Sequence, residues 1–192
     1  VDTSLAGTRV LFDGVPAPII YVLAGQTSVI VPYSVAGAPT TDMVVEYQGR
    51  HSDPVTLPVA SAAPGLFSAN ASGTGPGAIL NTDYSLNTAA NPVQKGGIVL
   101  LFGTGEGSTL PNGADGLLAN VAYPAPISKV TVTVGGLPAK VLYAGAAPGL
   151  VAGLIQVNLE IPAGAPAGNQ PVVMTTAAAS SQAGLTVADA HA

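Results

Sequence analysis

The sequence predicts an all-β protein made of two related sandwich modules in tandem, and three observations carry this prediction. Gly (24 residues) and Pro (17) are abundant while only 8% of the residues are charged, which indicates short strands joined by many turns. Clusters of Val, Ile and Leu recur at short, regular spacing between these turn signals, as they do in β-sandwiches. A stretch near the N-terminus also recurs in the second half of the chain, which predicts two copies of one module.

The repeat starts with two matching hairpin sequences. Residues 10–21 (VLFDGVPAPIIY) match residues 132–143 (VTVGGLPAKVLY) at one glycine and at the Pro-Ala and tyrosine positions. Further on, residues 26–32 (QTSVIVP) match residues 156–162 (QVNLEIP) from the glutamine to the proline. The two halves of the chain therefore share an order of strands and turns.

Each copy continues through a Gly/Ala/Pro turn into a valine-rich strand and closes with an alternating strand. These segments are residues 43–47 and 54–59 in the first copy, and residues 171–175 and 184–187 in the second. Gly14 and Gly136 separate short apolar runs, where a hairpin needs a residue that is free to adopt positive φ. The strand before Gly136 alternates with period two, which predicts that Val130, Val132 and Val134 share one buried face.

These segments divide the chain into four parts. We expect a first module over residues 1–62, a second over residues 98–188 and a short tail over residues 189–192. Residues 63–97 are predicted to form a linker that also supplies strands to the second module, because the run 78–80 is apolar. No segment shows convincing helical periodicity.

The order of the motifs resembles a known group of domains. Both copies contain a strand, the sequence Gly-x-Pro-Ala, a strand ending in Tyr, the pattern Gln-x-x-x-x-x-Pro and a valine strand. This order is similar to that of the TIG/IPT group of immunoglobulin-like domains, in particular to an uncharacterised domain at the C-terminal ends of large secreted proteins of acidobacteria. The resemblance implies two immunoglobulin-like (TIG/IPT-type) β-sandwich modules in tandem, in an extracellular or cell-surface bacterial protein that serves as a spacer, adhesin or filament subunit.

One departure from this pattern is informative. In this group an apolar strand ending in Gly-x-Gly precedes the repeat; the second copy has it at residues 98–105, whereas only residues 1–8 precede the first copy. A sandwich without this strand exposes unpaired backbone groups and apolar core. Three fillers are open: an upstream region, the linker around residues 67–80, or a strand donated by a neighbouring copy. We expect the neighbour, which gives a head-to-tail, open-ended homopolymer such as a filament.

Composition limits the other partners. The net charge is −5 and the five Lys and Arg residues are isolated from one another, so the basic stripe that nucleic-acid binding needs is missing. No apolar run reaches the roughly 18 residues of a membrane span. The chain contains no cysteine, which excludes disulfides and thiolate metal sites.

A weak calcium candidate lies in the predicted linker. Asn81, Asp83, Ser85 and Asn87 place oxygen-bearing side chains at alternate positions, as in the first half of a calcium loop. The sixth and twelfth positions of such a loop need Gly and Glu, but here they hold a leucine and a proline. Because the same side chains also make ordinary turns, we expect a hairpin turn and no metal or other cofactor.

The sequence predicts no catalytic residues and no enzymatic activity. His51-Ser52-Asp53 contains the residue types of a hydrolytic triad, but adjacent side chains of an extended segment point to opposite faces and cannot form a relay. The chain has no Gly-x-Ser-x-Gly motif and no pair of histidines at metal-binding spacing.

We expect partner contacts at Val10 and Phe12 in the first copy, and at Tyr84 and Tyr123 in turn-rich sequence. The leading interpretation is a non-enzymatic extracellular structural protein, a subunit of a surface assembly or filament held by β-strand pairing between subunits. The alternative is an adhesion or carbohydrate-binding module of a larger secreted protein, with a surface glycan as its ligand.

Overall fold

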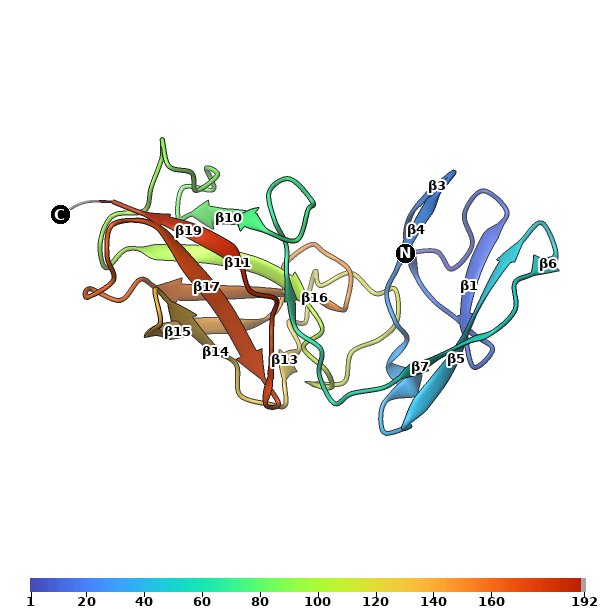
Figure 1. The fold of residues 1–192 in the computed structure, drawn as a ribbon. Coiled ribbons are helices and arrows are strands. Elements are labelled where there is room, and N and C mark those ends of the chain that lie inside the picture. The colour runs from blue at the N-terminus through green and yellow to red at the C-terminus, as the bar shows by residue number, and fades with distance from the viewer. Residues whose placement is uncertain (191–192) are drawn as a thin grey trace.

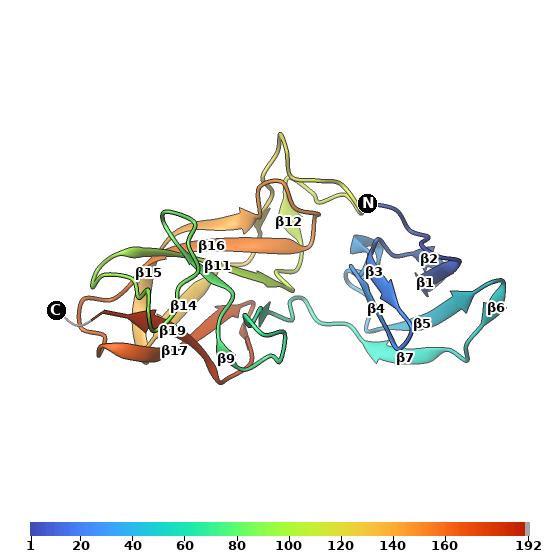
Figure 2. The same cartoon turned by 90° about the horizontal axis from the view of Figure 1, so that it is seen from above.

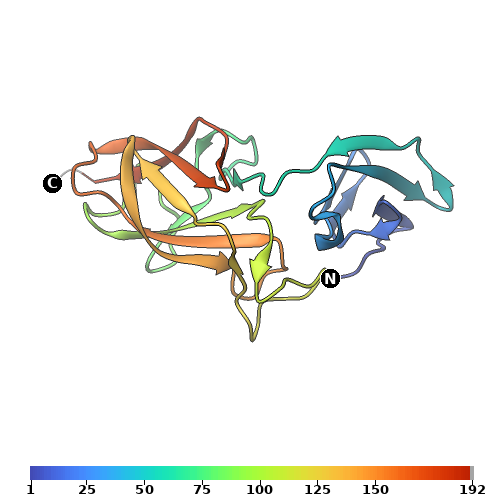
Figure 3. The same cartoon turned by 90° about the horizontal axis from the view of Figure 1, so that it is seen from below.

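A computed structural model describes residues 1–190 and shows an all-β protein (Figure 1). One 3-10 turn, Tyr33–Val35, interrupts the strands of these residues, and no helix among them has the length and apolar character of a membrane span. Two lobes lie side by side, joined by one extended linker (Figures 2 and 3). The predicted all-β class is confirmed; residues 191–192 of the predicted tail lie outside the described part of the chain.

The first lobe comprises residues 1–58. Its strands are β1 (Thr8–Phe12), β2 (Val15–Pro16), β3 (Ile19–Leu23), β4 (Gln26–Val29), β5 (Thr40–Tyr47), β6 (Arg50–His51) and β7 (Val55–Pro58). One sheet has the order β2-β1-β5-β6, with β7 also pairing with β5, and β3 and β4 form a separate hairpin. The lobe is therefore built from two small sheets.

The second lobe comprises residues 65–190. Its strands are β8 (Gly65–Leu66), β9 (Gly75–Pro76), β10 (Ile79–Asn81), β11 (Ile98–Thr104), β12 (Thr109–Leu110), β13 (Ala125–Pro126), β14 (Thr131–Val134), β15 (Leu137–Ala146), β16 (Leu154–Glu160), β17 (Gly168–Thr176), β18 (Ala179–Ser180) and β19 (Leu185–Asp189). Pairing runs without interruption through β10-β11-β16-β15-β14-β17-β19-β9. The sheet curls so that β11, β15 and β16 lie over β17 and β19 (Figure 2), the layered arrangement of a sandwich.

Both lobes use the same tight turn. Asp13-Gly14 joins β1 to β2 with φ of 49° and 81°, and Gly135-Gly136 joins β14 to β15 with φ of 60° and 78°. Two successive residues with positive φ form the type I′ turn, whose twist matches that of the flanking strands. In the first lobe, the Asp13 carboxylate also accepts a hydrogen bond from the Thr41 hydroxyl at 2.7 Å, which ties this turn to β5.

The lobes differ in the size of their cores. Seventeen buried residues form one apolar cluster in the second lobe, and the predicted buried face of Val130, Val132 and Val134 belongs to it. The buried cluster of the first lobe holds only Val10, Phe12 and Ala17. Most of the hydrophobic stabilisation therefore resides in the second lobe.

The lobes meet mainly at the loop between β12 and β13. The N-terminal ammonium of Val1 donates to the Gly116 carbonyl at 2.6 Å, and the Tyr33 amide donates to the Asp115 carboxylate at 3.0 Å. Gly113 lies so close to the Tyr33 ring that a Cβ at this glycine would overlap it. The first lobe thus touches the second through its first residue, through the Ile30 side chain just after β4, which lies against Gly153, and through the 3-10 turn that follows.

Candidate functional site

The open edge of the first lobe is the outer side of β4. In the second lobe, the hairpin β15–β16 is flanked by β11, which pairs with β16 from Ile98↔Glu160 to Thr104↔Leu154. The corresponding hairpin of the first lobe is β3–β4, and within the described residues β4 pairs with β3 alone. This edge lies on the side of the first lobe that faces the second (Figure 1).

Backbone amides mark the difference between the two edges. The Ile161 amide, just after β16, donates to the Gly97 carbonyl at 2.9 Å, whereas its sequence counterpart Val31 makes no hydrogen bond with residues 1–190. The Ile30 amide points the other way and donates to the Pro18 carbonyl at 2.9 Å. Because alternate residues of a strand point their amides to the same side, those of Thr27, Val29 and Val31 face the open edge.

Side chains near this edge are exposed where their counterparts are buried. Val31 is 50% exposed, whereas Ile161 is 1% exposed. On the opposite layer, Val55 at the start of β7 is 49% exposed, whereas its counterpart Leu185 at the start of β19 is fully buried. The same alternating pattern therefore yields a sealed interior in one lobe and accessible apolar surface in the other.

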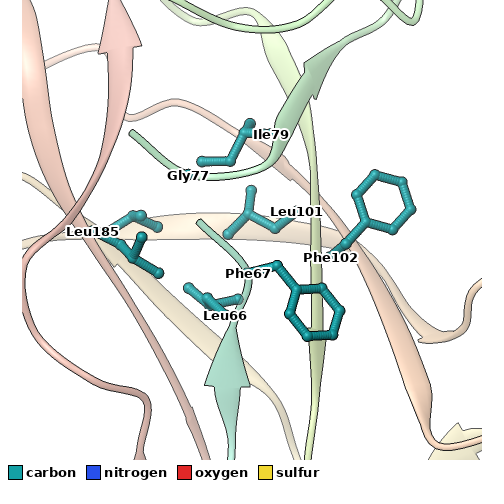
Figure 4. Close-up of a pocket in the computed structure, with 8 residues that line it drawn as sticks. Leu66, Phe67, Gly77, Ile79, Leu101, Phe102 and Leu185 are labelled. Carbon is teal, nitrogen blue, oxygen red and sulfur yellow. The ribbon is translucent and has the colours of Figure 1, made fainter. Parts of the chain in front are cut away.

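The segment before β12 seals the second lobe. Buried apolar side chains from this segment enter the core cluster; they are Leu66, Ile79, Val93, Val99 and Leu101. Figure 4 shows Leu66, Ile79 and Leu101 converging on Leu185, and the group leaves no room for a water molecule between its members. The described part of the first lobe has no segment in the equivalent place.

The structure decides against one of the three predicted fillers. Residues 67–80 do not enter the first lobe, because β9 pairs with β19 and β10 pairs with β11 in the second. Residues 1–7 do not cover β4 either: the Asp2 carbonyl accepts from the Ile19 amide at 2.8 Å, and Leu5 pairs with Thr8. The edge of β4 is thus not covered by the linker or by the N-terminal residues.

The calcium candidates lie together in the turn after β10, bonded to one another. The Asp83 carboxylate accepts from the Ser85 hydroxyl and from the Ser85 amide at 3.0 Å, and these bonds lower the pKa of Asp83. The Asn87 side-chain amide donates to Asn81 at 3.1 Å and to the Ala188 carbonyl at 2.9 Å, while its oxygen accepts from the Ala188 amide at 2.7 Å. Oxygens of all four candidates therefore already accept hydrogen bonds, because the Ser85 hydroxyl also accepts from the Asn91 side-chain amide at 2.8 Å, and Asn87 fastens this turn to β19.

The predicted partner residues separate into two groups. Val10 and Phe12 are buried in the first lobe's core, so they lie beneath the surface and not on it. Tyr84 is 73% exposed and adopts a φ of 65° at the tip of its turn, and Tyr123 is 47% exposed before β13. The two tyrosines are therefore the accessible members of the set.

Sequence reasoning missed a buried acid near the contact between the lobes. Glu106 is buried and its Oε2 has no hydrogen-bond partner; burial raises the pKa of this carboxyl. Burial and the nearby Glu106 raise the pKa of Tyr33 to about 12. In the sequence, Gly105-Glu106-Gly107 has the pattern of an exposed turn. In the structure this turn packs tightly against the linker, since a Cβ at either glycine would overlap a linker carbonyl, and Glu106 is buried there.

Other candidate chemistry is sparse in residues 1–190. No three His, Cys, Asp or Glu side chains converge there as metal ligands would. A depression of about 230 Å³ near the C-terminal end is lined by Pro92, Gly168, Asn169, alanines and the buried Asp189. These surfaces offer no nucleophile with an adjacent base.

The fold and the open edge together define an all-β, sandwich-like protein with one sealed lobe and one open lobe. No protein-family model matches the chain, and no curated protein matches it.

Proposed function

We propose that the protein is a non-enzymatic extracellular structural subunit, built from two immunoglobulin-like modules of the TIG/IPT type, that joins copies of itself head to tail. The observation that carries this proposal is the open edge of the first lobe, where unpaired amides and exposed valines stand in place of a sealed core. An edge of this kind pairs readily with an added strand.

The sequence of β4 supports a role in pairing. Edge strands that must stay unpaired are usually protected by Lys, Pro or a bulge. The residues of β4, Gln-Thr-Ser-Val, include no charged residue and no proline, and the bulge of this hairpin lies in β3. The edge therefore lacks the usual protection against association.

The shape of the molecule fits open-ended growth. The open edge belongs to the first lobe, and the second lobe has no equivalent opening, so a contact between the two lobes of successive copies joins two different surfaces. A contact between different surfaces leaves a free surface at each end and extends into a chain or filament, whereas a self-complementary contact stops at a dimer.

Sedimentation and light scattering across a wide concentration range test the proposal, together with negative-stain electron microscopy of the purified protein. We expect a mass that rises with concentration and elongated particles at the high end. A monodisperse monomer at the highest concentration would contradict the proposal.

The alternative function is adhesion or carbohydrate binding through the turns. Tyr84 favours it, because this aromatic ring is exposed on a backbone with positive φ, a combination often found at functional positions. A glycan array with wild-type protein and Tyr84→Ala tests it. Binding that the substitution abolishes would support adhesion, and an array without any signal would reject it.

A further inference from the structure

We propose that the outer edge of β4 is a specific binding site for an extended peptide strand with the chemistry of β11. This inference rests on the strand pairing of the proposed function and adds the direction, the register and the side chains that the incoming strand needs. It follows from the second lobe, which shows the same hairpin with its edge filled.

The filled edge fixes the direction and the register. In the second lobe, Val99 lies opposite Leu159 and Leu101 opposite Val157, in antiparallel pairing. By the sequence match of residues 26–32 with 156–162, the counterpart of Leu159 is Val29 and the counterpart of Val157 is Thr27. The incoming strand therefore runs antiparallel to β4.

Backbone bonds provide the first part of recognition. The amides of Thr27, Val29 and Val31 face outward, as do those of Val157, Leu159 and Ile161 toward β11. An antiparallel strand at this edge satisfies these groups with its own carbonyls, as in other cases where a peptide adds to a sheet.

Apolar side chains provide the second part. Incoming residues opposite Thr27 and Val29 point into the space that Val99 and Leu101 occupy in the second lobe, and these two are fully or almost fully buried there. In the second lobe, Leu185 lies beside Leu101, and the first-lobe counterpart of Leu185 is Val55, which is 49% exposed. Neither β4 nor β7 contains a charged residue, so the site selects apolar residues at alternate positions.

One position is less restricted than in the second lobe. Gly103 of β11 must lack a side chain, because a Cβ there would lie 2.5 Å from the Gly65 carbonyl of β8. The described part of the first lobe has no strand like β8. The residue that would lie opposite this position is Gly25, the counterpart of Ile155, and nothing lies within 4 Å of an added Cβ there. The incoming strand therefore accepts a larger residue at this position.

Fluorescence anisotropy with a labelled peptide tests the site on the full chain. The probe is the sequence of residues 97–105 (GIVLLFGTG) with two lysines at each end for solubility, and the control peptide carries Asp in place of the counterparts of Val99 and Leu101. We expect saturable binding of the probe and at least a tenfold loss with the control peptide. Equal binding of the two peptides, or no binding of the probe, would overturn the inference.

Thr27→Pro and Thr27→Val form the matched protein variants. A proline at 27 removes an outward amide and keeps the bonds between β3 and β4, because the latter come from the alternate residues. Valine keeps the amide and the branched shape. We expect Thr27→Val to bind like wild type and Thr27→Pro to bind at least tenfold more weakly; equal binding by both would overturn the inference.

Amide hydrogen exchange tests the site on wild-type protein, so the result does not depend on whether the proline variant folds. With wild-type protein, the probe should slow exchange of the amides of Thr27, Val29 and Val31, and leave those of β16 unchanged. Protection elsewhere without protection of these three amides would overturn the site.

The same data separate this inference from the proposed function. Specific peptide binding by a protein that stays monomeric at all concentrations would support the site and reject self-assembly. Self-association that Thr27→Pro leaves intact, combined with absence of peptide binding, would support assembly and overturn the site.

Discussion

The two lobes carry similar hairpins but reach different degrees of burial. The second lobe buries seventeen apolar residues in one cluster and the first buries three. The difference does not come from the hairpins, because β3–β4 and β15–β16 share their register and the place of their bulge, although the loop that joins the two strands is longer in the second lobe. It comes from the strands β8 to β11, which cover the second lobe and have no equivalent in the described part of the first.

This comparison separates local from non-local information. Alternation of apolar residues determines which side of a strand is suited to an interior. Whether that side is buried depends on strands far away in the sequence. The energetic value of a given apolar residue therefore differs between the lobes, and matched substitutions measure the difference.

The largest expected difference concerns Ile161 and its counterpart Val31. Ile161→Ala should lower the free energy of unfolding of the second lobe by about 2–5 kcal/mol, because it leaves a cavity in a sealed core. Val31→Ala should change the stability of the first lobe by less than about 0.5 kcal/mol in dilute protein, because half of this side chain is already in water. Urea unfolding followed by circular dichroism measures both. Similar losses in the two variants would show that the first lobe is sealed in solution.

The next difference concerns Asn87, which belongs to the covering segment. Asn87→Ala removes two bonds to the Ala188 backbone in a buried position and should destabilise the second lobe by about 1–3 kcal/mol. Asp83→Ala is the control, because its bonds stay within an exposed turn, and its effect should be under about 0.5 kcal/mol. A rise in melting temperature on adding Ca²⁺ that Asp83→Ala abolishes would contradict this structural role and restore the calcium hypothesis.

The sequence identifies the features that depend on neighbours along the chain. The sequence alone indicates the Asp-Gly and Gly-Gly turns and the alternating strand of Val130, Val132 and Val134. It also shows that different segments precede the two repeats. They rest on turn chemistry and on period-two alternation, which are local properties.

Contacts between distant residues carried no such signal. The parallel pairing of Leu185 with Gly75, the bonds of Asn87 to Ala188 and the contact of Gly113 with Tyr33 each join segments with no sequence similarity. The accessible edge of β4 was predicted only in general terms, because finding the exposed amides requires the register of both hairpins.

A smaller expected effect concerns the pH dependence introduced by Glu106 near the lobe contact. Because burial raises the pKa of Glu106 in the folded state, its contribution to stability is full below the unfolded pKa near 4.5 and is lost as pH rises through the folded pKa. Each pKa unit corresponds to about 1.4 kcal/mol. Glu106→Gln should therefore gain stability relative to wild type as pH rises from 4 to 7. The difference between the two unfolding curves measures this, and a difference that does not change with pH would contradict the buried acid.

The smallest expected effects come from the two ion pairs found within residues 1–190, one in each lobe. Arg9 contacts Glu46 at 3.3 Å between β1 and β5, and Lys140 contacts Glu160 at 3.5 Å between β15 and β16. Lys140 is the more exposed cation, so water and salt screen its pair more strongly. Lys140→Ala should change stability by less than about 0.5 kcal/mol, and Arg9→Ala by no more than about 1 kcal/mol. Denaturation at low and high salt measures both.

The same two substitutions should differ in their effect on the melting temperature. Because the first lobe has so small a core, an ion pair forms a larger fraction of its total stability. The Arg9 substitution should therefore lower the melting temperature of the first lobe more than the Lys140 substitution lowers that of the second.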